Sequence, residues 1–193
     1  MRGNDHSNHI DLTVEEQRLH HEKSSTSLGD IKDSVIKEIM NMPELSRFHV
    51  DGLYRIPVGK LRSNAVRLHA VCRYRKGVRK TDKILPLDVK CIDIHPKVLN
   101  HRWMKYAKFL LYHEYLHALG FSNHGKKFRR LEALWYDQDA RKMGRSFGVY
   151  IRKLNDRWLW LCPSCGIRYS RSKKSNGRYR CRSCNSLLID IQK

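Results

Sequence analysis

The chain has 193 residues and six cysteines, with 40% hydrophobic residues and a formal net charge of +20 at pH 7. This length suits one medium domain and a small module, and the hydrophobic content is enough for a packed core. The positive charge predicts attraction to polyanions, with nucleic acid ahead of an anionic membrane. No apolar run reaches the ~18 residues that a membrane span needs, and the N-terminus lacks the apolar segment of a secretory signal. We therefore expect a cytoplasmic protein without a membrane partner, in a compartment that keeps thiols reduced.

Residues 1–27 are polar, charged and rich in histidine, and they offer no rigid scaffold for a metal. We expect them to form a flexible tail. From Leu28 the apolar residues recur at helical spacing until Pro43, which predicts a helix packed on the domain core. Its buried face would comprise Ile31, Val35, Ile36 and Ile39.

Three strand-like runs follow this helix, namely LYRIPVG (53–59), AVRLHAVCRYR (65–75) and VKCIDIHP (89–96). Alternation of apolar and polar residues predicts a small sheet of about three strands, with a basic turn at KGVRKTDKI. Cys72 and Cys91 lie within these runs, so we interpret them as buried structural thiols.

Residues 102–119 give the strongest helix signal, and apolar residues cover most of the predicted helix, so it should be buried. Gly120 is well placed as its C-cap. A second helix is predicted from about Gly125 to Met143, before the glycines at 144 and 148 break the pattern. Its apolar face would comprise Phe128, Leu131, Leu134 and Trp135.

His113 and His117 lie four residues apart on the first of these helices, so both imidazoles project from one face. Two ring nitrogens at this spacing can reach one Zn²⁺ ion, and Glu114 follows the first histidine directly. This is the HExxH arrangement of zinc metallopeptidases, in which the glutamate removes a proton from the attacking water and the zinc polarises the scissile carbonyl. The apolar setting favours this interpretation over incidental histidines, because unpaired charge there is unfavourable.

The third zinc ligand has several candidates. In the pattern HExxHxxGxxH the last position falls on Asn123, a poor zinc ligand, so that pattern fails. A glutamate-type site would take its ligand from the next helix, where Glu132 and Asp137 lie. We favour His124, because it immediately precedes the segment where the chain must turn back and begin a new helix.

The segment HEYLHALGFSNHGKKFRRLEAL resembles the SprT-like zinc metallopeptidases, which combine HExxH, a short link and a His-Gly-x-x-Phe/Trp motif that opens the next helix. CIDIHPKVLN is similar to the family's strand and Asn/His-Pro turn before the active-site helix. The resemblance implies a zincin-like fold with Glu114 as general base, although the link between the second and third histidines is shorter than in many members. The matching residues are His113, Glu114, His117, His124, Gly125 and Phe128.

Two CxxC pairs, formed by Cys162, Cys165, Cys181 and Cys184, are separated by fifteen residues. Four thiolates at this spacing can surround one Zn²⁺ ion tetrahedrally, and so short a segment needs the metal to fold. We predict a zinc ribbon with a structural zinc, in which a strand, a basic turn at Asn176–Gly177 and a second strand separate the pairs. Many SprT-like proteins carry such a ribbon after the protease domain, so the resemblance extends from about residue 28 to the end.

Much of the positive charge lies in this C-terminal module, interleaved with aromatic residues. Arginine and lysine bind phosphates, and aromatic rings stack on unpaired bases, so we predict nucleic-acid contacts here. Trp158 and Trp160 are interpreted instead as the small core of the ribbon. The predicted contact residues are Arg168, Arg171, Lys173, Lys174, Arg178, Tyr179 and Arg180.

These features predict an α+β protein with a tail (1–27), a SprT-like zincin protease domain (28–152) and a four-cysteine zinc ribbon (153–193). It would be a monomeric zinc metalloendopeptidase with two zinc ions, one catalytic and one structural. The resemblance implies action on proteins bound or crosslinked to DNA, as in the eukaryotic Spartan branch, hence DNA repair at the nucleoid or in the nucleus. The alternative is a non-enzymatic nucleic-acid-binding ribbon protein with a structural or vestigial histidine site, in which Glu114 would have no purpose.

Overall fold

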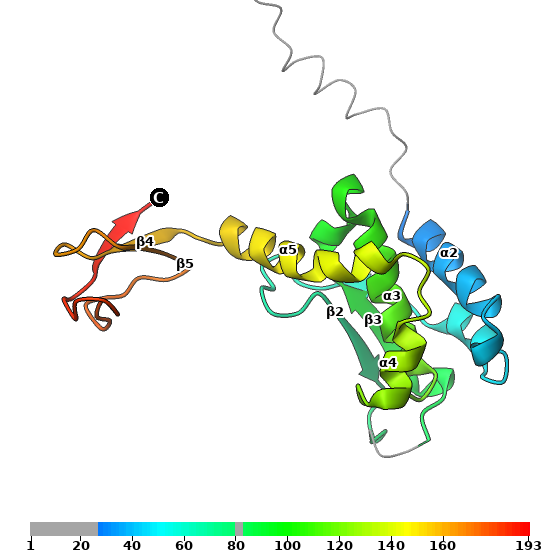
Figure 1. The fold of residues 1–193 in the computed structure, drawn as a ribbon. Coiled ribbons are helices and arrows are strands. Elements are labelled where there is room, and N and C mark those ends of the chain that lie inside the picture. The colour runs from blue at the N-terminus through cyan, green and yellow to red at the C-terminus, as the bar shows by residue number, and fades with distance from the viewer. Residues whose placement is uncertain (1–26, 80–82) are drawn as a thin grey trace, which may run out of the picture.

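The structure is a computed structural model that describes residues 27–79 and 83–193. The predicted tail up to residue 26, with His6, His9, His20 and His21, lies outside the described residues, as does the middle of the predicted basic turn (80–82). The described residues form helices and two β-sheets, so the α+β class is confirmed (Figure 1). Within these ranges we find no helix that combines the length and apolar character needed to cross a membrane.

Helix α2 (Leu28–Met40) begins where the sequence predicts. Ser27 caps its first turn, because the Ser27 hydroxyl accepts from the Asp30 amide while the Asp30 carboxylate accepts from the Ser27 amide. The predicted apolar face is confirmed, since Ile31, Val35, Ile36 and Ile39 are all fully buried.

The first sheet has strands β1 (Val58–Lys60), β2 (Ala70–Tyr74) and β3 (Val89–Ile94), in the order β1-β3-β2. Strand β3 is central, with β1 parallel to it and β2 antiparallel. The three-stranded sheet is therefore confirmed, and β2 is one of its edges.

Two of the predicted strands are shorter than expected. The start of the first run belongs to a 3-10 helix (Val50–Arg55), and residues 65–69 of the second run form no strand. Leu68 is 51% exposed, so the alternation of apolar and polar residues begins before the chain enters the core. Cys72 and Cys91 are half-buried in β2 and β3 rather than fully buried.

Helix α3 (Met104–Ala118) follows a short 3-10 helix (His101–Trp103) and carries the HExxH motif. Ten of its residues are buried, as the apolar sequence predicts. It packs against α2, β2, β3 and α5 (Gln138–Leu154), so it forms the centre of the first core.

The second predicted helix is wrong in its extent, because the chain forms two helices there. Helix α4 (Lys126–Glu132) ends early, and α5 begins after Asp137, whose carboxylate accepts from the amides of Asp139 and Ala140. That N-cap restarts the helix in a new direction. Phe128, Leu131 and Trp135 are nevertheless buried.

Gly144 and Gly148 lie inside α5 and do not end it. A Cβ atom at Gly144 would lie 3.0 Å from the hydroxyl oxygen of Tyr106, and one at Gly148 would lie 3.5 Å from a ring carbon of His69. The glycines therefore allow close packing of α5 on its neighbours, which offsets their weak helix propensity.

The second sheet has strands β4 (Trp158–Leu161), β5 (Arg168–Arg171) and β6 (Ile189–Gln192), in the antiparallel order β5-β4-β6. Helix α5 extends from the first core to this sheet (Figure 1). The predicted hairpin between the cysteine pairs is wrong in its second half. After the turn at Asn176–Gly177 only an isolated bridge joins Arg180 to Leu187, because β5 pairs with β4 instead.

Candidate functional site

Three histidines converge beside helix α3. His113 and His117 project from α3, and His124 comes from the loop before α4; one ligand atom from each lies within 4.8 Å of the others. The Nε2 atoms of His113 and His124 are 3.1 Å apart. Nitrogens at ~2.0–2.1 Å from a tetrahedral Zn²⁺ ion would be about 3.4 Å apart, so the cluster has the dimensions of a three-histidine zinc site.

The second ring nitrogens of two histidines have acceptors. His113 Nδ1 lies 2.7 Å from Glu132 Oε1, and His117 Nδ1 lies 2.7 Å from the carbonyl oxygen of Phe121. A carbonyl can only accept, so Nδ1 of His117 carries the proton and its Nε2 lone pair is available to a metal. The ionised Glu132 carboxylate imposes the same tautomer on His113. Both rings are thereby oriented for ligation through Nε2.

The end of α3 supplies the carbonyl that orients His117. Gly120 has a φ of 99°, the Gly120 amide donates to the carbonyl of His117, and the Phe121 amide donates to the carbonyl of Leu116. This is a Schellman motif, in which the left-handed residue follows the cap, here Leu119. The reversed chain brings the Phe121 carbonyl back against the His117 ring.

His124 is held by the turn that opens α4. The Gly125 amide donates to Asn123 Oδ1 at 3.1 Å, and a Cβ atom on Gly125 would lie 2.9 Å from that oxygen. The ring of Phe128, one turn into α4, lies between 4.7 and 4.9 Å from the ring centres of all three histidines. The residues of the His-Gly-x-x-Phe motif thus act together: glycine permits the turn, and phenylalanine supports the imidazoles.

Glu114 is 7% exposed and lies close to His113 and to the backbone of Cys72 on β2. Burial raises the pKa of its carboxyl group, while the neighbouring His113 and the backbone amide of Cys72 on β2 act in the opposite direction. A buried carboxyl group beside three convergent imidazoles is suited to accept a proton from water at the same site.

The alternative third ligands have other roles. Glu132 accepts from His113, its second oxygen lies 3.3 Å from Arg141, and the hydrogen bond from His113 lowers the pKa of its carboxyl group. Asp137 caps α5 and pairs with Lys105 at 3.3 Å. Within the described ranges, the histidine cluster that could hold a metal includes neither acid. From the sequence, Glu132 could be identified only as a possible metal ligand. The sequence does not indicate that Glu132 instead accepts a hydrogen bond from the candidate ligand His113.

The four cysteines of the C-terminal module form the second cluster. Sulfur atoms of Cys162 and Cys184 are 3.3 Å apart and those of Cys165 and Cys181 are 3.5 Å apart, with all four within 4.8 Å. Sulfurs at ~2.3 Å from a tetrahedral Zn²⁺ ion would be about 3.8 Å apart, so the cluster fits one zinc site.

Two matching turns present these cysteines. Gly166 and Asn185 each follow the second cysteine of a pair and have positive φ values of 72° and 59°. Their amides donate to the carbonyls of Cys162 and Cys181, respectively. The same turn therefore occurs twice, as the two CxxC pairs require.

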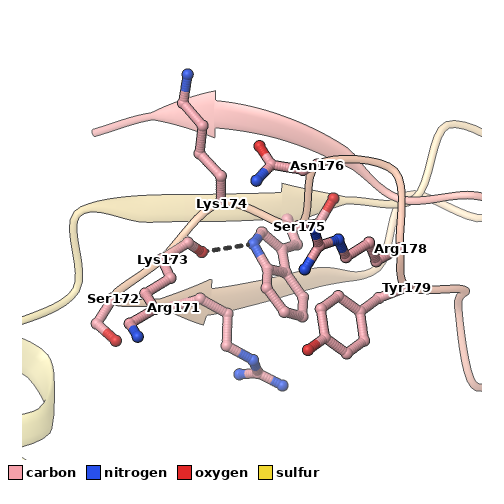
Figure 2. A pocket seen from close by; sticks show the side chains of 9 residues that line it. Arg171, Ser172, Lys173, Lys174, Ser175, Asn176, Arg178 and Tyr179 are labelled. Atoms are coloured by element: carbon pink, nitrogen blue, oxygen red, sulfur yellow. Dashed lines mark hydrogen bonds between the residues drawn. The ribbon is translucent and has the colours of Figure 1, made fainter.

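A basic cavity of about 460 Å³ lies on the ribbon (Figure 2). Its loop, residues 172–177, is fixed from two sides: Trp160 Nε1 donates to the Lys173 carbonyl at 2.9 Å, and Asp190 accepts from the amides of Ser175 and Asn176. The ring of Tyr179 stacks on Trp160 at 4.5 Å, and Tyr179 is 51% exposed. The cavity therefore combines basic side chains around a fixed loop with an accessible aromatic ring.

The structure brings together most of the predicted nucleic-acid contacts. Arg180 lines an adjoining cavity with Tyr179 and donates to the Asn185 carbonyl. Arg168 lies elsewhere, because residues three apart on strand β5 point to opposite faces and Arg171 faces the cavity. Trp160 belongs to the small buried core with Trp158 packed against it, as predicted. The predicted residues that line the first cavity are Arg171, Lys173, Lys174, Arg178 and Tyr179.

Comparison with known proteins gives a match in the C-terminal module. Residues 156–192 match the family described as the SprT-like zinc ribbon domain. Neither the curated proteins nor the solved structures contain a match to the chain. The matched segment holds all three strands of the second sheet and all four clustered cysteines. Residues 156–192 are therefore a SprT-like zinc ribbon, and this supports the resemblance of the chain to the SprT-like family with a C-terminal zinc ribbon.

Proposed function

We propose that the chain is a zinc-dependent endopeptidase of the SprT-like type that acts on proteins bound or crosslinked to DNA. One observation carries this proposal: three imidazoles converge at zinc-site distances with a buried carboxyl group beside them. The resulting protease domain would be zincin-like, with His113, His117 and His124 as ligands of a second, catalytic zinc ion.

Each residue has a separate task in this proposal. A zinc ion at the histidines would polarise a peptide carbonyl and acidify a water molecule. Glu114 accepts a proton from the attacking water and then passes it to the nitrogen of the leaving amine. Glu132 and the carbonyl of Phe121 keep the rings of His113 and His117 in the ligating tautomer.

The sheet offers a place for an extended substrate. Strand β2 is an edge, and the Cys72 amide on that edge reaches the Glu114 carboxyl group. A peptide that pairs with this edge would run past the general base. A cavity of about 660 Å³ opens next to the histidines, with Phe48, Phe121 and Phe128 among its apolar lining. We assign this cavity to a substrate side chain.

The ribbon supplies the nucleic-acid contact in this proposal. Arginines and lysines around its cavity would bind phosphates, and the exposed face of Tyr179 would stack on an unpaired base. The net charge of +20 favours the same partner. The protein would act as a monomer at the nucleoid or in the nucleus, where protein substrates on DNA are found.

Glu114→Gln tests the enzymatic part. The purified variant should keep two zinc ions per chain and the wild-type unfolding temperature, but lose cleavage of a protein conjugated to DNA. Glu38→Gln, an exposed carboxylate on α2, is the control and should cleave normally. Equal cleavage by Glu114→Gln would exclude Glu114 as the base. A wild-type chain that binds DNA but cleaves nothing would favour the non-enzymatic binding protein.

A further inference from the structure

A second basic cavity lies between helix α5 and the chain that enters strand β2. It has a volume of about 540 Å³, and its lining residues come from two segments of the first core. Arg67 and His69 approach from the loop before β2, while α5 supplies Arg145 and Arg152. The cavity is distinct from the histidine cluster and from the ribbon, since it shares no residue with either.

The two glycines of α5 form part of the cavity wall. Gly144, Gly148 and Arg152 recur every four residues, so they share one face of the helix. A Cβ atom at Gly148 would lie 3.3 Å from a guanidinium nitrogen of Arg152 and 3.5 Å from the ring of His69. The face of α5 toward the cavity therefore carries no side chain at positions 144 and 148, and the arginines of the helix lie around them.

The arginines of this cavity have no acidic partner among the described residues. Its lining includes no acidic residue, and throughout the described ranges Arg67, Arg145 and Arg152 form no ion pair with a carboxylate. All three are exposed. Other cations of this domain, such as Arg73 and Arg141, do pair with acids. Burial lowers the pKa of His69, and the nearby His95 and Arg152 act in the same direction, which agrees with a positive local potential.

We propose that this arginine cavity binds phosphate groups of a DNA strand and extends the ribbon's nucleic-acid surface onto the first core. Guanidinium groups suit this role, because each can donate two parallel hydrogen bonds to one phosphate. Phosphate contacts are independent of sequence, so they fix the position of the strand without selecting bases. The proposal rests on DNA as the partner in the proposed function, and it adds a second contact point.

Helix α5 makes the extension direct. Arg152 lies near its C-terminal end, and strand β4 of the ribbon begins at Trp158, six residues later. A strand held at both places would span the connection between the histidine-bearing core and the ribbon. DNA binding would then bring the histidine site close to proteins attached to the same strand.

The test measures DNA affinity of the full-length protein against salt concentration. A fluorescein-labelled oligonucleotide, single-stranded and as a duplex, is titrated with wild type and with the triple variant Arg67→Gln/Arg145→Gln/Arg152→Gln. A control triple variant, Lys37→Gln/Arg55→Gln/Lys90→Gln, removes the same charge from exposed positions outside both cavities. The logarithm of affinity falls with the logarithm of salt by ~0.7–0.9 per phosphate contact, so the slope of the cavity variant should decrease by about two to three.

The control slope should change much less, because those residues contribute only to the general field. Equal slopes for the two triple variants would overturn the proposal, even where the ribbon variant Arg171→Gln/Lys173→Gln/Lys174→Gln shows that the ribbon binds. Absence of binding by wild type would instead reject DNA as partner, and with it both proposals. If the triple variant unfolds, the single exchange Arg145→Gln is measured instead and should lower the salt slope by about one. An unchanged slope for this single variant would overturn the proposal.

Discussion

His113 Nδ1 lies 2.7 Å from Glu132 Oε1, so the first histidine of the HExxH motif is anchored by an acid from the end of α4. The other carboxylate oxygen of Glu132 faces Arg141 of α5 at 3.3 Å. One carboxylate of α4 thereby links α3, which carries the HExxH motif, to α5. It is 9% exposed, so its contacts are shielded from water.

Glu132→Ala should weaken zinc binding at the histidine site by about 10–100-fold, because the His113 ring loses the acceptor that orients it. Competition with a chromogenic chelator measures this, and the ribbon zinc serves as an internal reference. Glu132→Gln keeps an accepting oxygen and should be intermediate. Asp139→Ala, which removes an exposed acid of α5, should behave like wild type. If Glu132→Ala released zinc from the histidine site no more readily than wild type, packing alone would hold His113 in place.

Gly120→Ala should destabilise the fold by ~1–3 kcal/mol, since its φ of 99° is unfavourable for a residue with a Cβ atom. The added Cβ would also lie 3.0 Å from the carbonyl oxygen of Ile84. Urea unfolding at fixed zinc concentration gives the difference.

Gly77→Ala is the matched control, because Gly77 has a φ of 92° and no neighbour within 4 Å of an added Cβ. It should show the backbone effect alone. If Gly120→Ala were no more destabilising than this control, the contact with Ile84 would be readily relieved. Wild-type stability of Gly120→Ala would argue against the Schellman turn as a support of His117.

The elements that the sequence predicts well are those with a continuous buried face. Helix α2 repeats apolar residues at one helical period from end to end, and α3 is apolar almost all round. The prediction fails where local signals and packing compete. Helical spacing continues across residues 133–137, but the Asp137 cap divides the helix there, and Gly144 remains helical because Tyr106 packs against it.

The candidate site shows the same difference between features that are local in the sequence and features that depend on packing. The histidine and cysteine clusters could be predicted, because ligand spacing within a helix or a CxxC turn is a local property of the chain. The role of Glu132 could not be predicted, because its contact with His113 depends on the angle between α3 and α4. The arginine cavity could not be predicted either, because Arg67 and Arg145 are distant in sequence and line one cavity only through the packing of α5.

Removal of zinc should unfold the ribbon while the first core stays folded. The buried core of the ribbon consists of Trp160, Cys162, Cys181 and Leu188, and two of these four are predicted ligands. Without the metal, so little apolar surface cannot offset the chain entropy of ordering the segment. Amide NMR spectra after chelation should lose dispersion for residues 156–192 alone. Retained dispersion there would mean that the ribbon folds without zinc.

Tyr179→Ala should weaken binding of single-stranded DNA by ~1–3 kcal/mol, or about 5- to 150-fold, because a base loses the exposed ring on which it stacks. The slope against salt should stay unchanged, since no charge is removed. Duplex binding should be affected less, because paired bases are stacked already and do not need the ring. Tyr136→Ala removes a tyrosine that is 61% exposed outside the ribbon and should have no effect on either substrate. An equal loss for single strand and duplex would indicate that Tyr179 supports the shape of the cavity rather than a base, because both substrates share the phosphate contacts of its loop.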